Sequence, residues 1–93
     1  MFVALLTLEL HIPGSGSLKD RRRVVKGMKD RIRSRFNVSV AEVGETELWQ
    51  RATLGIACVS NDRAHASEVL DKVVDLVRSN TSAGLIDYGV EFL

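Results

Sequence analysis

Apolar and polar residues alternate along the first segment of the chain, Phe2–Ile12. One side of this segment carries Leu6, Leu8, Leu10 and Ile12, and the other carries Thr7, Glu9 and His11. A period of two is typical of a β-strand that buries one face. A Pro-Gly-Ser-Gly run at residues 13–16 then ends the predicted strand.

The next stretch, Ser17–Phe36, has the period of an α-helix. Its apolar stripe consists of Leu18, Val25, Met28, Ile32 and Phe36. Ser17 is the expected N-cap, because its hydroxyl can accept a hydrogen bond from a free N–H group of the first turn. Asp20 lies three residues further on and supplies a weak form of the capping box.

Four more elements are predicted in the rest of the chain. The β-branched residues of Val38–Val43 indicate a second strand, and Arg51–Ser60 is a third, with Leu54, Ile56 and Cys58 on one face. Asn61 and Asp62 precede a second helix, Arg63–Ser79. Its apolar stripe is Ala66, Val69, Leu70, Val73 and Val77. The final strand is Leu85–Leu93, with Ile86, Tyr88, Val90 and Phe92 on one face.

The predicted order is βαββαβ, which favours one α+β domain over residues 1–93 with a ferredoxin-like sandwich. Two helices then cover one face of a four-stranded antiparallel sheet, and the other face stays open. Right-handed crossovers place the first and third strands in the centre and the second and fourth at the edges. The predicted core contains Leu8, Leu10, Val25, Met28, Ile32, Leu54, Ile56, Val69, Val73 and Val90.

The amino-acid composition suggests where in the cell the protein is found, but it indicates no catalytic or binding chemistry. The 93 residues are 45% hydrophobic and 27% charged, which is typical of a globular domain. A single cysteine, Cys58, permits no internal disulfide and favours a reducing cytoplasm. The first residues show neither a basic region followed by a cleavage site nor an uninterrupted apolar span, so neither a signal peptide nor a membrane partner is expected.

Charge distribution changes the picture, because Ser17–Phe36 holds 9 basic and 2 acidic residues in a chain whose net charge is +1. Its net charge of +7 suggests an anionic partner. The cationic stripe, as we call it, is Lys19, Arg22, Lys26, Lys29 and Arg33, with Arg23 beside it. Steps of three and four residues place the stripe along one helical flank. Two interpretations stay open: a nucleic-acid-binding face or a solvated basic surface.

The loop Gly14, Ser15, Gly16 and Ser17 precedes this helix. Backbone N–H groups at a helix N-terminus can bind phosphate, so the loop is a candidate anion site as well as a structural turn. Neither the dinucleotide fingerprint nor the phosphate-loop motif is complete here, because Lys19 occupies the place of the third glycine and no Gly-Lys-Ser/Thr follows.

Three blocks of the chain resemble the YlxP-like family of small bacterial proteins, a domain of unknown function. The blocks are HIPGSGSLKDRRRVVKGMKDRIRSRFNVSVAEV, LWQRATLGIACVSND and EVLDKVVDLV. The resemblance implies a ferredoxin-like fold. Family members are often encoded beside translation initiation and ribosome-maturation factors, which implies a role near the ribosome. No catalytic residue can be carried over from the family.

Three functions follow as hypotheses. The first is non-enzymatic binding of RNA, ribosomal RNA in particular, through the cationic stripe and Arg23. The second is a homodimer that uses the open sheet face or an edge strand. On the open face, small or exposed residues of the third strand would let another sheet approach. Those residues are Thr53, Gly55, Ala57 and Val59. The third is an acylphosphatase-like enzyme, disfavoured because the family's motif is absent and the third strand has no asparagine before Asn61.

The remaining chemically active residues support no metal or cofactor site, and no small-molecule substrate is implied. Glu9 and His11 share a strand face, but two ligands are too few for a metal centre. Cys58 is expected in the core. Trp49 is either a partner anchor or a ring that folds over the edge of the core.

Overall fold

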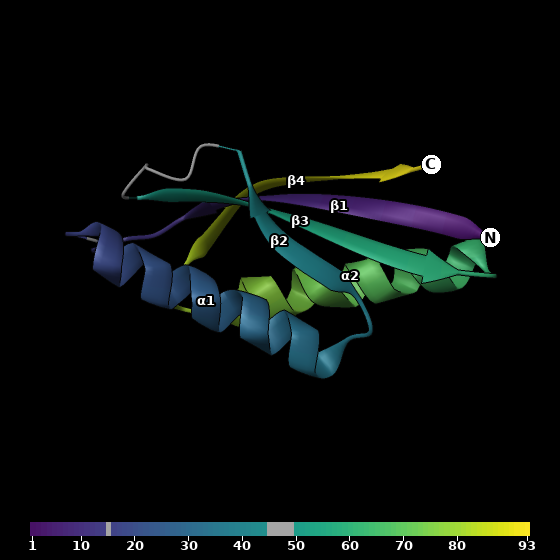
Figure 1. Cartoon of the computed structure of the whole chain (residues 1–93), viewed down its shortest axis with the longest axis horizontal. Helices are drawn as coiled ribbons and strands as arrows, with labels where there is room; N and C mark the ends of the chain where they lie inside the picture. The colour runs from purple at the N-terminus through teal and green to yellow at the C-terminus, as the bar shows by residue number, and fades with distance from the viewer. Residues whose placement is uncertain (15, 45–49) are drawn as a thin grey trace.

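The computed structural model describes residues 1–14, 16–44 and 50–93 (Figure 1). Its elements are β1 (Phe2–His11), α1 (Leu18–Arg35), β2 (Ser39–Val43), β3 (Arg51–Ser60), α2 (Arg63–Ser79) and β4 (Gly84–Phe92). The order is the predicted one, and each boundary lies within one residue of the predicted boundary, so the alternating and helical periods located every element correctly.

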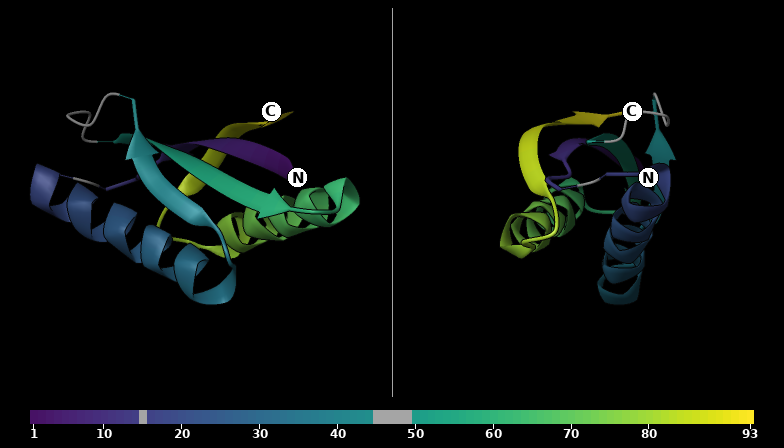
Figure 2. Two further views of the ribbon diagram at one scale, coloured as in Figure 1. Left: turned by 45° about the vertical axis from the view of Figure 1, so that its right-hand side comes forward. Right: turned by 90° about the vertical axis from the view of Figure 1, so that its left-hand side faces the viewer.

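The four strands form one sheet in the order β2-β3-β1-β4, and every neighbouring pair is antiparallel. Both helices lie on the same side of this sheet, where α1 packs against β2 and α2 packs mainly against the central strands β1 and β3 (Figure 2). The structure therefore confirms the ferredoxin-like sandwich, with β1 and β3 central and the opposite face of the sheet open.

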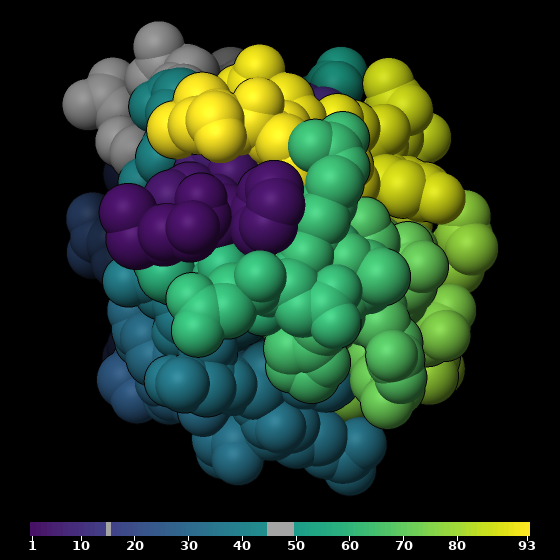
Figure 3. Space-filling model, turned by 90° about the vertical axis from the view of Figure 1, so that its right-hand side faces the viewer, coloured from purple at the N-terminus to yellow at the C-terminus, as the bar shows by residue number. Residues whose placement is uncertain are grey.

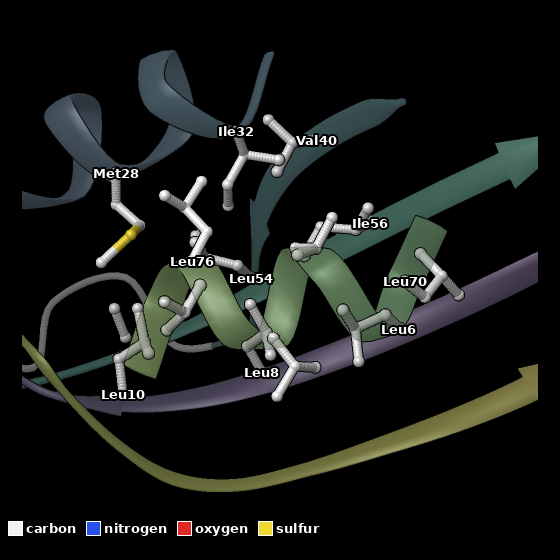
Figure 4. Packing of buried hydrophobic residues seen from close by; sticks show 14 of the residues in the cluster. Leu6, Leu8, Leu10, Met28, Ile32, Val40, Leu54, Ile56, Leu70 and Leu76 are labelled. Atoms are coloured by element: carbon white, nitrogen blue, oxygen red, sulfur yellow. The ribbon is translucent and has the colours of Figure 1, made fainter. Parts of the chain in front are cut away.

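The core lies between the sheet and the helices. Leucines of β1 and β3 meet Met28 and Ile32 from α1 and Leu70 and Leu76 from α2 (Figure 4). Ile32 is fully buried, as the helical stripe predicts. Of the predicted core, Val69 is half-buried against the cluster and Val90 lies outside it.

The helix caps follow the sequence. The Ser17 hydroxyl accepts from the Asp20 N–H at 3.1 Å and so caps α1. The Asp62 carboxylate caps α2, because Oδ1 accepts from the N–H groups of Ala64 at 2.9 Å and His65 at 3.2 Å. Each cap satisfies amide groups that have no partner within the helix.

Strand β4 differs from the prediction in burial. Val90 lies opposite the buried Leu6, yet it is 43% exposed. The register shifts between Glu9 and Leu10, so Leu85, and not Ile86, lies opposite Leu10. The face was predicted correctly for Val90, but β4 is an edge strand that α2 covers only in part, so the prediction of a buried Val90 was wrong.

The two termini lie side by side at one end of the molecule, next to the start of α2 (Figure 3). The Leu93 N–H donates to the Val3 carbonyl oxygen at 2.9 Å, so the β1–β4 ladder continues to the last residue of the chain. This bond also fixes which amide groups of β4 point toward β1.

Candidate nucleic-acid interface

Arg21 is the one charged residue of α1 that the fold buries, with 2% of its surface exposed. Its Nη1 and Nη2 donate to the two carboxylate oxygens of Glu42 on β2, at 3.3 and 2.5 Å. Its Nε donates to the Arg51 carbonyl oxygen at 3.1 Å. A planar guanidinium matches a carboxylate in this bidentate way, so the residue links α1 to β2 and to the start of β3.

The sequence analysis did not separate Arg21 from the other cations. A signal was present, because Arg21 precedes Val25, Met28 and Ile32 by steps of four, three and four residues and so lies within the apolar stripe. Glu42 likewise shares the face of β2 that carries the buried Val40. A basic and an acidic residue, each on a buried face, are the expected partners of a buried ion pair.

Most of the cationic stripe is accessible. Lys19, Arg22, Lys26 and Arg33 are exposed, and Lys29 is half-buried. Within residues 1–14, 16–44 and 50–93, no carboxylate lies within ion-pairing distance of Lys19, Arg22 or Lys29. These three cations are therefore available to an external anion.

The other members of the stripe interact with Asp30. Lys26 Nζ donates to Asp30 Oδ2 at 2.7 Å, and Arg33 Nη1 lies 3.7 Å from Asp30 Oδ1. The hydrogen bond from Lys26, together with the charges of Lys26, Arg33 and Lys29, holds the pKa of the Asp30 carboxyl below its usual value. The stripe thus keeps a positive potential that a carboxylate on the same helix only partly neutralises.

Two of the predicted RNA-binding residues, Arg33 and Arg23, also interact with other groups of the protein. Arg33 Nη2 donates to the Val40 carbonyl oxygen on β2 at 2.8 Å, which places the stripe on the β2 side of α1. Arg23 lies off the stripe, where its guanidinium contacts the Asp20 carboxylate at 3.4 Å. Arg33 therefore has a role in packing in addition to any role in binding.

The loop before α1 is explained in part by backbone geometry. Gly14 has a φ of 72°, a conformation that favours glycine, so this residue serves a structural turn. Gly16 is exposed and Ser17 caps the helix, whereas Ser15 lies outside the described residues. Phosphate binding by this loop stays a prediction.

The open sheet face carries the four residues predicted for an interface. Thr53, Gly55, Ala57 and Val59 lie on one side of β3, and Val59 is 64% exposed. Next to them is a shallow apolar groove of about 350 Å³ that spans β1, β2 and β3 and whose floor includes Gly55 and Ala57. The Thr53 hydroxyl donates to Glu9 Oε2 at 2.8 Å, so one of the four residues is already engaged.

The remaining candidate residues form no chemical centre in the described part of the chain. No three His, Cys, Asp or Glu residues there lie close enough together to hold a metal ion. Cys58 is buried among apolar neighbours, as predicted. Trp49, predicted as an anchor or a core cover, lies outside the described residues. Neither described helix is long and apolar enough to span a membrane.

Comparison with solved structures supports the fold. The de novo designed protein Foldit4 aligns with a TM-score of 0.53 at 10% identity, covering 99% of this chain and 94% of that one. A C-terminal segment of the alpha subunit of aIF2 from Pyrococcus abyssi aligns with a TM-score of 0.52 at 16% identity. That match covers 98% of this chain and 49% of the other. At such identities the likeness shows the fold alone.

Sequence comparison goes further. The uncharacterized protein YlxP from Bacillus subtilis (strain 168) is 39% identical over 71 residues, which span 76% of this chain and 77% of the relative. The family described as "Protein of unknown function (DUF503)" matches residues 3–90. The resemblance noted in the three sequence blocks is thereby confirmed, and the chain belongs to the DUF503 family, which includes YlxP-like proteins.

Proposed function

We propose that this protein is a non-enzymatic accessory protein of the cytoplasm that binds structured RNA through the cationic stripe of α1. The observation that carries the proposal is the state of Lys19, Arg22 and Lys29. They follow one helical flank, and no carboxylate among the described residues pairs with them. A row of cations at helical spacing suits the phosphates of a nucleic-acid backbone.

The distribution of acidic residues also supports this orientation. Glu9, Asp87 and Glu91 lie on the open face of the sheet, across the sheet from the helices. A polyanion would therefore be attracted to the α1 side and repelled from the open face. The molecule has an electrostatic polarity that its small net charge conceals.

Recognition by shape and charge fits this surface better than base readout does. RNA-binding sheets stack bases on exposed aromatic rings. In the described part of the chain, the open-face positions of the sheet carry no Phe, Tyr or Trp, and His11 is the one ring-bearing residue there. Tyr88 and Phe92 face the helix side, where Arg78 and Arg63 lie over their rings. Helical RNA bound along its phosphates is thus the favoured ligand, and ribosomal RNA fits the genomic setting that the family resemblance implies.

The structure gives one argument against phosphate chemistry of the acylphosphatase type. That hypothesis needs an arginine near the start of α1 that points at the loop. Arg21 is held by Glu42 and the Arg51 carbonyl oxygen, so its guanidinium is not available to a phosphate. This restriction applies to Arg21 alone, because Arg22 and Arg23 are exposed.

The experiment that tests RNA binding compares two double variants with equal loss of charge on the same helix. Arg22 and Lys29 are replaced by glutamine in the first, and Arg31 and Arg35 in the second. Fluorescence anisotropy with a labelled RNA hairpin measures the affinity of each. Loss of affinity in the first variant alone supports the proposal, whereas equal affinities of both variants and the parent contradict it.

Self-association through the open sheet face is a second candidate, favoured by the apolar groove and by the exposure of Val43 and Val59. Gly55 and Ala57 have small side chains or none, so another sheet can approach the floor of the groove closely. Asp87 and Glu91 lie on β4, away from this groove, whereas Glu9 accepts a hydrogen bond from Thr53 near it. The two candidates are compatible, since a dimer would present two cationic stripes.

A further inference from the structure

The two edges of the sheet are protected to very different degrees. Strand β2 has 5 residues, Ser39–Val43, and Arg33 donates to the carbonyl oxygen of Val40, the second of them. Strand β4 has 9 residues and forms the other edge. Short strands and charged side chains that bind edge groups hinder the addition of another strand. Of the two edge strands as far as the structure describes them, β4 therefore presents the longer edge.

The backbone groups of β4 that point outward can be identified. Because the Leu93 N–H donates to Val3, the alternation of an antiparallel ladder directs the N–H groups of Glu91 and Gly89 toward β1. The N–H and C=O groups of Tyr88, Val90 and Phe92 are then directed toward the free edge. Consistent with this, the Tyr88 N–H donates to Asp87 Oδ1 at 2.9 Å and not to β1.

The open-face side of this edge is acidic. Asp87 and Glu91 lie two positions on either side of Gly89, and no lysine or arginine occurs in β4. Asp87 also lies directly opposite Glu9 of β1. Like charges directly opposite each other in a sheet are unfavourable, so a nearby cation would relieve this repulsion.

The helix-face side of the edge carries exposed apolar groups next to two arginines of α2, because Arg78 lies over the Tyr88 ring and Arg63 over the Phe92 ring. Tyr88 and Val90 are 41% and 43% exposed, although their ladder partners Leu8 and Leu6 are buried. The edge thus offers carboxylates on one face and exposed apolar groups on the other. Between them lie the outward backbone groups of Val90 and Phe92, whereas the outward N–H of Tyr88 is already bonded to Asp87.

We propose that β4 is a docking edge for an extended, basic segment of a partner protein, which adds a fifth strand to the sheet. Alternate lysine or arginine residues of that segment lie beside Asp87 and Glu91, and the intervening apolar residues lie beside Tyr88 and Val90. Backbone hydrogen bonds supply affinity in strand addition, and alternate side chains supply specificity.

Charge argues against a second copy of this chain as the occupant. An antiparallel pair of β4 strands centred on Gly89 would place Asp87 of one copy opposite Glu91 of the other, on both sides of the centre. A basic strand converts the same positions into attractive pairs. Because α1 lies along the opposite edge of the sheet, RNA and the basic segment can bind at the same time (Figure 2).

The test uses the full chain and a peptide as long as β4 in which lysine and valine alternate. Hydrogen exchange of individual amides is followed by NMR. The peptide is expected to slow exchange at Val90 and Phe92, whose N–H groups point outward, and to leave Glu91 unchanged. A control peptide in which glutamate replaces lysine is expected to have no effect.

Val90→Pro provides the decisive variant, because it removes an outward N–H without removing a hydrogen bond to β1. We expect it to weaken binding of the lysine peptide by about tenfold or more. Val90→Thr keeps the amide and changes only the side chain, so it is expected to weaken binding much less than Val90→Pro does. A folded Val90→Pro protein that binds as tightly as the parent would overturn the proposal.

A second pair of substitutions covers the case in which Val90→Pro does not fold. Asp87→Asn with Glu91→Gln keeps the size of both side chains and removes their charge, so binding should weaken and lose most of its salt dependence. Unchanged binding and salt dependence would contradict the proposal that the partner segment is basic. A parent protein that dimerises through this edge, with no protection by the peptide, would identify a second copy as the occupant and also overturn the proposal.

Discussion

Arg21 and Glu42 form a bidentate ion pair between α1 and β2, in which the arginine side chain is 2% exposed and the carboxylate side chain 16%. The pair neutralises one of the basic residues of α1. It also holds α1 against β2, next to the cationic stripe. A buried ion pair is not a strong source of stability in itself, because both charges lose their hydration. Removing one partner lowers the free energy of unfolding strongly, because the other charge is left buried without a counter-ion.

This asymmetry predicts the outcome of a double-mutant cycle. Glu42→Leu strands the fully buried guanidinium and should lower the free energy of unfolding by about 3–5 kcal/mol. Arg21→Met should cost less, because the Glu42 carboxylate can reach water. The double variant should recover most of the loss in urea unfolding. Additive effects of the two single substitutions would show that the pair does not act as a unit.

RNA binding through the stripe predicts a defined dependence on salt. If five phosphates are neutralised, the logarithm of the affinity should fall with the logarithm of salt concentration with a slope of roughly −3.5 to −4.5. Replacing Arg22 and Lys29 by glutamine should flatten this slope by about one to two units. The melting temperature should hold or rise slightly, because repulsion along the helix falls. Replacing Arg31 and Arg35 by glutamine is the control, and the slope of that variant should stay close to that of the parent.

The lowered pKa of Asp30 predicts that the stability of the fold depends slightly on pH. The pKa of its carboxyl is lowered chiefly by the hydrogen bond from Lys26. The ionised form therefore favours the folded state above the usual aspartate pKa, and this gain is lost as pH falls through the lowered value. NMR titration of the carboxyl should show the lowered midpoint, and Lys26→Gln should raise it. Lys72→Gln, on α2, should leave the midpoint unchanged.

Burial predicts opposite results at Ile32 and Val90, which the helical and strand patterns had both assigned to the core. Ile32→Ala should cost about 2–5 kcal/mol, because Ile32 is fully buried between α1 and the sheet. Val90→Ala should cost less than about 1 kcal/mol, because Val90 lies exposed on an edge strand. Urea denaturation of both variants measures the difference, and equal costs would mean that β4 is more deeply packed than its exposure indicates.

Self-association through the open face predicts a dimer in light scattering at micromolar concentration. Ala57→Arg places a charge on the floor of the groove and should yield monomers without unfolding the protein. Gly55→Ala is a milder control, because its added Cβ would lie 3.4 Å from a Val43 methyl carbon, a normal contact. A monomeric parent protein would rule out this mode of assembly.

The sequence by itself determined the order and the boundaries of the elements. Alternation in Phe2–Ile12 and the helical stripe of Ser17–Phe36 follow from backbone periods of 2 and 3.6 residues, which local residue choice must match. The caps at Ser17 and Asp62 are also local, because a side chain one to three residues away satisfies the free amides. The cationic stripe was visible for the same reason, since its members share one flank of a single helix.

Tertiary structure decided which faces of the elements are buried and which charged side chains are bonded within the protein. Val90 shares a face with buried residues, but it stays exposed because β4 extends beyond the cover of α2. The period places Arg21 on the apolar stripe and Arg33 on the cationic stripe, but their partners, Glu42 and the Val40 carbonyl oxygen, lie on another element. A period assigns a side chain to a face of its own element, whereas burial and pairing depend on what lies opposite that face, and only packing of the elements brings those groups together.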